Sequence, residues 1–92
     1  MNAAMQPYGI LQTPFAIDAL QSLEAAALPK VTQKLFELQT NPRPDGHEPA
    51  EEYGKGLSSI VIQDTSPPYR LIYQVDDEVR RVVVISISQR WA

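Results

Sequence analysis

Two stretches near the C-terminus decide the fold of this chain: YRLIYQV at residues 69–75 and VVVISISQR at residues 82–90. In each stretch apolar and polar side chains alternate with a period of two, which predicts a β-strand with one buried face. The segment between them contains the acidic run Asp76, Asp77 and Glu78, which we interpret as a solvated turn. Together these segments predict an antiparallel hairpin.

The apolar pattern also restricts how the two strands can pair. The buried faces are expected to carry Leu71, Tyr73 and Val75 on the first strand and Val83, Ile85 and Ile87 on the second. These side chains share one side of the hairpin only if paired residue numbers have an even sum, which a three-residue loop at residues 77–79 provides. The expected outward face then carries Arg70, Ser86, Ser88 and Arg90. Two guanidinium groups on neighbouring strands can hold a phosphate between them.

The N-terminal half predicts a short strand and two helices. Residues 8–12 are expected to form the strand, and Thr13 and Pro14 provide a helix N-cap and a proline in the first turn. The spacing of apolar residues predicts one helix over residues 15–27 and a second from Pro29 to Thr40. Pro29 separates the two helices because it lacks a backbone donor and restricts the residue before it.

The middle of the chain predicts a long loop and a third long strand. Residues 41–49 contain three prolines and an Asp-Gly turn signal, and the loop is expected to continue to residue 56. Residues 57–63 read as a strand with Ile60 and Ile62 on one face and Ser59, Val61 and Gln63 on the other. The whole pattern predicts an α+β fold: an N-terminal strand and a helical hairpin packed on a small twisted sheet with an antiparallel C-terminal meander.

Composition limits the class of protein. The 92 residues are expected to form a single domain, with residues 1–7 as a flexible N-terminus, and 43% hydrophobic residues fit a globular core. The absence of cysteine excludes a disulfide scaffold and a thiolate metal site, and we expect no metal and no cofactor. No apolar run approaches the roughly 20 residues of a membrane span, so a cytoplasmic protein without membrane contact is expected.

The net charge of −3 is unusual for a protein that binds nucleic acid, because such domains generally present a basic face. The distribution of charge softens this objection. The acidic residues gather in the expected loop and turn, whereas several basic residues fall in the C-terminal part of the chain: Lys55, Arg70, Arg80, Arg81 and Arg90. A local basic patch is therefore compatible with the sequence, but strong non-specific binding is not expected.

The order of strand, helical hairpin, loop and three-stranded meander resembles the RelE/ParE superfamily of bacterial toxin–antitoxin toxins. The closer resemblance is to the RelE branch, on residues 69–75 and 84–90. It implies a type II toxin that acts in the cytoplasm as a ribosome-dependent mRNA endonuclease, a hydrolase that inhibits translation. Cleavage in this branch proceeds by attack of the ribose 2′-hydroxyl on the adjacent phosphate. The implied partners are a cognate antitoxin, in a toxin–antitoxin hetero-oligomer, and the ribosome with its mRNA.

By this resemblance, Arg70 and Arg90 correspond to the two catalytic arginines that stabilise charge on the phosphate. The candidates for RNA binding are Lys55, Ser59, Arg81, Ser86, Ser88 and Trp91. Where the family carries two lysines on the preceding strand, this chain has Ser59 and Val61. The family's C-terminal helix with a catalytic tyrosine has no counterpart before the sequence ends at Ala92, so the general acid and base are not visible.

Other interpretations of these residues stay open. Arg70 and Arg90 are also compatible with solvated charges at strand ends, and Trp91 with an aromatic that closes the core rather than a base-stacking residue. The missing lysines, the missing tyrosine and the acidic charge favour a second function. In that case the protein is a ParE-like inhibitor of DNA gyrase, or an attenuated toxin that serves as an antitoxin-binding module.

Overall fold

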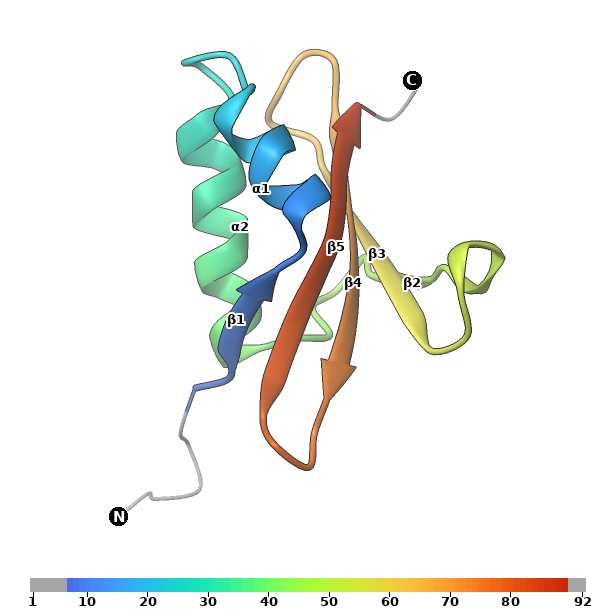
Figure 1. Ribbon diagram of the computed structural model, residues 1–92. Helices are drawn as coiled ribbons and strands as arrows, with labels where there is room; N and C mark the ends of the chain where they lie inside the picture. The colour runs from blue at the N-terminus through green and yellow to red at the C-terminus, as the bar shows by residue number, and fades with distance from the viewer. Residues whose placement is uncertain (1–6, 90–92) are drawn as a thin grey trace.

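The computed structural model describes residues 7–89 of the chain. Within these residues, five strands form one mixed sheet in the order β1-β5-β4-β3-β2, and two α-helices cover one of its faces (Figure 1). β1 runs parallel to β5, and the other neighbours are antiparallel. The elements are β1 (Gly9–Gln12), α1 (Pro14–Gln21), α2 (Leu28–Thr40), β2 (Glu48–Pro49), the 3-10 turn η2 (Glu51–Tyr53), β3 (Leu57–Ile62), β4 (Tyr69–Asp76) and β5 (Arg81–Gln89). The predicted α+β fold is confirmed.

Thr13 begins α1 and also fastens it to the sheet. Its hydroxyl oxygen accepts a 3.2 Å hydrogen bond from the backbone N–H of Ala16, as expected of an N-cap. The same hydroxyl donates a 2.7 Å hydrogen bond to the carbonyl oxygen of Ile85 on β5. Its backbone N–H donates to the carbonyl oxygen of Val84 at 3.0 Å. One residue therefore orients the helix and ties it to the strand beneath.

The first helix is shorter than predicted. It ends at Gln21, where the N–H of Ser22 turns back to the carbonyls of Asp18 and Ala19. Residues 22–27 then reverse the chain, and α2 begins at Leu28 with Pro29 in its first turn, as expected for the second helix. The helical spacing of apolar residues extends to Ala27 in the sequence because Ala27 is also part of the core. It reaches the core from the turn at residues 22–27 and not from a helix.

The core fills the space between the helices and the inner face of the sheet, which is the face toward the helices. The stripe predicted on α2 is buried as expected, with Val31 and Leu38 fully inaccessible. Burial also raises the pKa of Tyr73 to about 12. The sheet contributes its largest buried side chains from the hairpin: Leu71, Tyr73, Val82 and Val84. Between residues 7 and 89, neither helix has the length and apolar character needed to span a bilayer.

The strand pairing of the hairpin corrects one prediction and confirms another. Near the turn the partners Tyr73 and Val84 give an odd sum, because the loop has four residues, 77–80, rather than three. A β-bulge then skips Ile85, and beyond it the partners Ile72 and Ser86 give the even sum that was expected. The buried positions of β5 near the turn are consequently Val82 and Val84, not the predicted Val83 and Ile85, whereas Ile87 is buried as predicted.

The segment before β3 contains structure that was predicted as loop. Glu48 and Pro49 form a two-residue edge strand whose partners on β3 are Ser59 and Ser58. A proline is tolerated there because an edge strand needs no donor on its open side. The 3-10 turn η2 follows directly and leads to Gly54, at a φ of 154° that favours glycine.

Candidate functional site

Arg70 lies on the outward face of β4, the side of the sheet opposite the helices. Its cross-strand neighbours are Val61 on β3 and Ser88 on β5. Ser86 lies on the same face in the next row, opposite Ile72. The predicted grouping of Arg70, Ser86 and Ser88 on one face is therefore confirmed within residues 7–89. Arg90 and Trp91, which were also predicted to belong to this site, lie outside the described residues.

The guanidinium of Arg70 is held by two side chains of η2 that the sequence interpretation missed. Its Nη1 donates to the hydroxyl of Tyr53 at 3.3 Å, and its Nη2 lies 3.4 Å from Oε2 of Glu52. The guanidinium carbon also lies 5.2 Å from the centroid of the Tyr53 ring, within range of a cation–π contact. These contacts leave the Arg70 side chain 25% exposed. An exposed ion pair contributes at most about 1 kcal/mol, so this arrangement is easily displaced.

No local sequence signal pointed to this contact. Glu52 and Tyr53 stand 18 and 17 residues before Arg70, in a segment with loop-like composition. An acidic residue beside an aromatic residue in a Pro/Gly-rich loop was the only available hint. The contact depends on the connection between β2 and β3, which contains η2 and brings Glu52 and Tyr53 to Arg70 on β4.

The remaining predicted site residues differ in exposure and in their distance from Arg70. Lys55 is exposed in the turn between η2 and β3, and Ser88 is exposed beside Arg70. Ser59 lies on the outward face as predicted but is only 3% exposed, so it is not available for direct contact with RNA. Arg81 is exposed at the opposite end of β5, seven residues from Ser88, or about 23 Å along a strand. The structure does not bring Arg81 together with Arg70.

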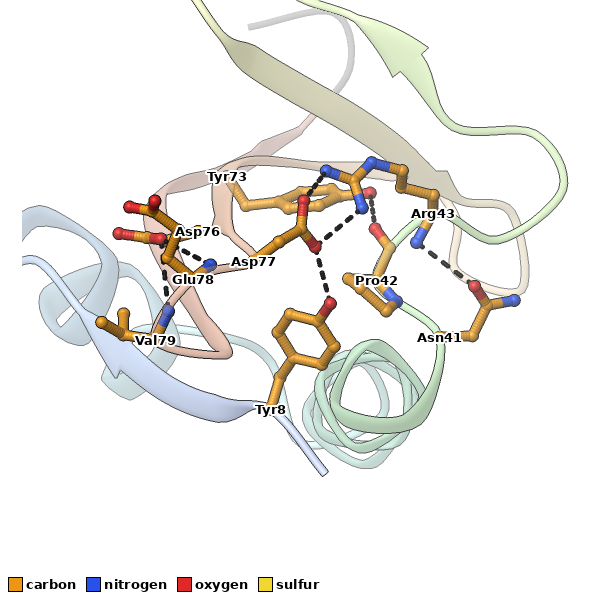
Figure 2. Close-up of polar contacts among 9 residues, drawn as sticks. All are labelled: Tyr8, Asn41, Pro42, Arg43, Tyr73, Asp76, Asp77, Glu78 and Val79. Atoms are coloured by element: carbon orange, nitrogen blue, oxygen red, sulfur yellow. Dashed lines mark hydrogen bonds and ion pairs between the residues drawn. The ribbon is translucent and has the colours of Figure 1, made fainter. Parts of the chain in front are cut away.

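A second polar cluster lies at the β4–β5 loop, and Figure 2 shows its geometry. The carboxylate of Asp77 accepts a 2.6 Å hydrogen bond from the hydroxyl of Tyr8 and two from the guanidinium of Arg43, at 3.2 and 2.9 Å. The bonds from Arg43 and then Tyr8 hold the pKa of Asp77 at about 2. The bond to Asp77 raises the pKa of Tyr8. Asp77 lies in the predicted turn and its side chain is 56% exposed, but it also binds Tyr8 and Arg43, which was not predicted.

This cluster connects three segments of the chain. Arg80, at a positive φ of 51°, places its guanidinium carbon 4.3 Å from the centroid of the Tyr8 ring. The hydroxyl of Tyr73 donates a 2.8 Å hydrogen bond to the carbonyl of Pro42 in the loop after α2 (Figure 2). The start of β1, the loop after α2 and the β4–β5 loop are thus held together.

An apolar groove of about 270 Å³ lies between β1 and the helices. Phe36, on its rim, is 66% exposed, although large apolar side chains are generally buried. The side-chain oxygen Oε1 of Gln12 is buried at this groove and has no hydrogen-bond partner among residues 7–89. The groove is lined by Ile10, Gln12, Leu20, Thr32, Leu35, Phe36 and Gln39. The exposed apolar rim of this groove makes it a candidate protein–protein interface.

Comparison with known proteins points to one group of bacterial toxins. No protein-family model matches the sequence, and no curated protein matches it. Among solved structures, the isolated E. coli RelE toxin is similar at 27% identity and a TM-score of 0.74, over 89% of this chain and 83% of that one. A chain of the Mycobacterium tuberculosis toxin–antitoxin complex RelBE2 is similar at 28% identity and a TM-score of 0.76, over 96% and 97%.

A chain of the intact E. coli RelBE toxin–antitoxin complex is similar at 28% identity and a TM-score of 0.69, over 89% of this chain and 95% of that one. In all three comparisons the similarity covers most of both chains, so it concerns the whole fold and not a shared fragment. The predicted resemblance is confirmed, and the chain belongs to the RelE/ParE superfamily with a RelE-like, type II toxin fold.

Proposed function

We propose that this protein is the toxin of a type II toxin–antitoxin system and acts as a ribosome-dependent mRNA endonuclease. The observation that carries the proposal is the position of Arg70 on the outward face of a RelE-like hairpin, with the exposed hydroxyl of Ser88 beside it. The reaction is attack of the ribose 2′-hydroxyl on the adjacent phosphate. The protein needs no cofactor for it.

Arg70 supplies the electrostatic part of this reaction. A guanidinium stabilises the charge that develops on the phosphate oxygens in the transition state, and its planar fork matches two of those oxygens. Arg90, two residues beyond Ser88 in the sequence, is the proposed second cation. Ser86 and Ser88 on this face, and Lys55 in the turn before β3, are the proposed contacts to RNA.

The proposed partner of the free protein is an antitoxin that covers the apolar groove between β1 and the helices. Two of the similar solved structures are toxin–antitoxin complexes. The exposed ring of Phe36 and the neighbouring apolar rim formed by Leu28 and Pro29 extend the groove along α2. The side of α2 from Leu28 to Gln39 spans about 16 Å, which suits three turns of an amphipathic helix.

Induced expression followed by primer extension on mRNA tests the nuclease. We expect cleavage at codons in the ribosomal A site, and we expect Arg70→Ala to abolish it. Lys30→Ala is the matched control, because Lys30 is a half-exposed cation on α2 whose only recorded ion pair within residues 7–89 is with Asp64, at 3.8 Å. Intact mRNA during growth arrest would contradict the proposal.

A second function is favoured by the surroundings of Arg70. Its cross-strand neighbours Val61 and Ser88 carry no charge, and its guanidinium is already paired with Glu52. A ParE-like inhibitor of DNA gyrase would block supercoiling in vitro while mRNA stays intact. An attenuated toxin would bind an antitoxin without arresting growth.

A further inference from the structure

We infer that Glu52 and Tyr53 of η2 are the proton-transfer residues of the site around Arg70. This inference rests on the proposed RNA cleavage, for which the sequence offered no general acid or base. Of the described residues, these two contact the Arg70 guanidinium through its terminal nitrogens. One is a carboxylate that can accept a proton, and the other is a phenol that can donate one.

The turn that carries both side chains is fixed at its base. Ala50 is fully buried, and its N–H donates to the carbonyl of Leu57 at 2.9 Å, which closes the segment against β3. The N–H of Tyr53 donates to the carbonyl of Ala50 at 3.0 Å. A Cβ atom at position 54 would lie 3.0 Å from Leu57 Cδ1, so the chain passes close to β3 at Gly54. The backbone of η2 is thus a defined platform and not a free loop.

The two side chains remain open to a ligand on the outward face. The side chain of Glu52 is 61% exposed, and Tyr53 is 58% exposed. A phosphodiester that approaches Arg70 from solvent therefore meets Glu52 and Tyr53 at the same time.

In the proposed step Glu52 takes one proton from the RNA and Tyr53 gives one to it. The 2′-oxygen forms a bond to phosphorus, and the proton of the 2′-hydroxyl passes to the Glu52 carboxylate. The bond between phosphorus and the 5′-oxygen breaks, and this oxygen takes the phenolic proton of Tyr53. The products are a 2′,3′-cyclic phosphate and a 5′-hydroxyl. Transfer of the proton from Glu52 to the Tyr53 phenolate restores both groups.

Proton transfer to Glu52 also changes the charge around Arg70. In the resting site the carboxylate neutralises part of the guanidinium charge at a distance of 3.4 Å. Once Glu52 is protonated, that charge is free to stabilise the phosphate oxygens at the moment they become more negative. The interaction is stronger in the transition state than in the ground state, which is the condition for catalysis.

Two simpler roles predict different results from substitution. If Glu52 only competes with the phosphate for Arg70, Glu52→Gln should bind RNA more tightly and cleave faster. If Tyr53 only stacks its ring on the guanidinium, Tyr53→Phe should retain full activity. Either result would overturn the inference for that residue.

The experiment measures single-turnover cleavage of mRNA on programmed ribosomes by the full chain. We expect Tyr53→Phe and Glu52→Gln each to lower the rate by about 10²–10⁴-fold, the usual contribution of a general acid or base. Glu51→Gln, in the same turn, and Tyr69→Phe, whose side chain is buried on the inner face, are the matched controls and should cleave normally. All four variants should retain the thermal unfolding of the parent.

A modified substrate separates proton donation from a structural effect. An mRNA with sulfur in place of the bridging 5′-oxygen needs no proton on its leaving group. Tyr53→Phe should cleave this substrate at nearly the parent rate, whereas Glu52→Gln should remain slow. A defect of Tyr53→Phe that persists on the sulfur substrate would rule out the proposed donor. Absence of cleavage by the parent protein would instead contradict the proposed function, which keeps the two failures distinct.

Discussion

The hydroxyl of Tyr8 donates a 2.6 Å hydrogen bond to Oδ1 of Asp77, although 69 residues separate them in the sequence. The guanidinium of Arg43 completes the carboxylate's partners from a third segment of the chain. The ends of β1, α2 and β4 are thereby joined at one carboxylate (Figure 2). Protonation of the Asp77 carboxylate should therefore lower the stability of the whole domain.

We expect the cluster to make stability depend on pH in the acid range. The pKa of Asp77 falls from an ordinary 3.8 to about 2 in the folded protein, chiefly through Arg43. Its contribution is complete above the unfolded value of about 4 and is lost as pH falls through about 2. The melting temperature should accordingly drop more steeply between pH 4 and 2 in the parent than in Asp77→Asn. Asp64→Asn, at a largely exposed carboxylate, should follow the parent curve.

Tyr73→Phe should lower the free energy of unfolding by about 1–2 kcal/mol, because the carbonyl of Pro42 loses its buried hydrogen bond. Urea denaturation measures the change. Tyr69→Phe provides the comparison, since Tyr69 is also buried but no hydrogen bond of its hydroxyl is recorded among residues 7–89. Equal effects of the two substitutions would contradict the role assigned to the Tyr73 bond.

Two glutamines that line the apolar groove should respond in opposite directions. Gln12→Met should raise the free energy of unfolding by about 1 kcal/mol, because it removes a buried oxygen that has no partner among residues 7–89. Gln39→Met should lower it, because the Nε2 of Gln39 donates a 3.2 Å hydrogen bond to the carbonyl of Tyr8. Chemical denaturation of both variants gives the sign, and a loss of stability in Gln12→Met would contradict the prediction.

Phe36→Ser should leave stability within about 0.5 kcal/mol of the parent, since the ring is mostly exposed. If the groove receives the antitoxin, the same variant should bind it at least about tenfold more weakly, as is typical of aromatic residues at the centre of an interface. Calorimetric titration measures the affinity. Val79→Ser, an exposed apolar residue in the β4–β5 loop, should bind normally.

The sequence predicted most of the strands and helices because their signals are local. The cap at Thr13 and the stripe of Val31, Leu35 and Leu38 on α2 depend only on neighbouring residues, and both are present. The bulge at Ile85 was not predictable in the same way. Four consecutive apolar residues, 82–85, fit either alternation, so the sequence does not define which of them are buried in this part of β5.

The same contrast between local signals and long-range contacts applies to the candidate site. The shared face of Arg70 and Ser88 followed from strand alternation and a register. The contacts of Arg70 with Glu52 and Tyr53 did not, because they depend on how a loop returns across the sheet. The burial of Ser59 was missed for a related reason, since alternation assigns a residue to a face but does not say what covers that face.

The bond from Thr13 to Ile85 has a consequence for any attempt to divide the chain. Ile85 is the residue that the β4–β5 pairing skips. Its carbonyl oxygen accepts a hydrogen bond from Thr13, the N-cap of α1, 72 residues earlier. A fragment that contains only residues 57–92 would lack the Thr13 hydroxyl. The β-bulge at Ile85 would then lose one of the hydrogen bonds that stabilise it. The two strands of the fragment could then pair without the bulge, which would separate Arg70 and Ser88 onto different faces. Reassembly with a fragment that contains Thr13 should return Arg70 and Ser88 to the same face. Fragment complementation would therefore measure how the start of α1 controls the register of β5.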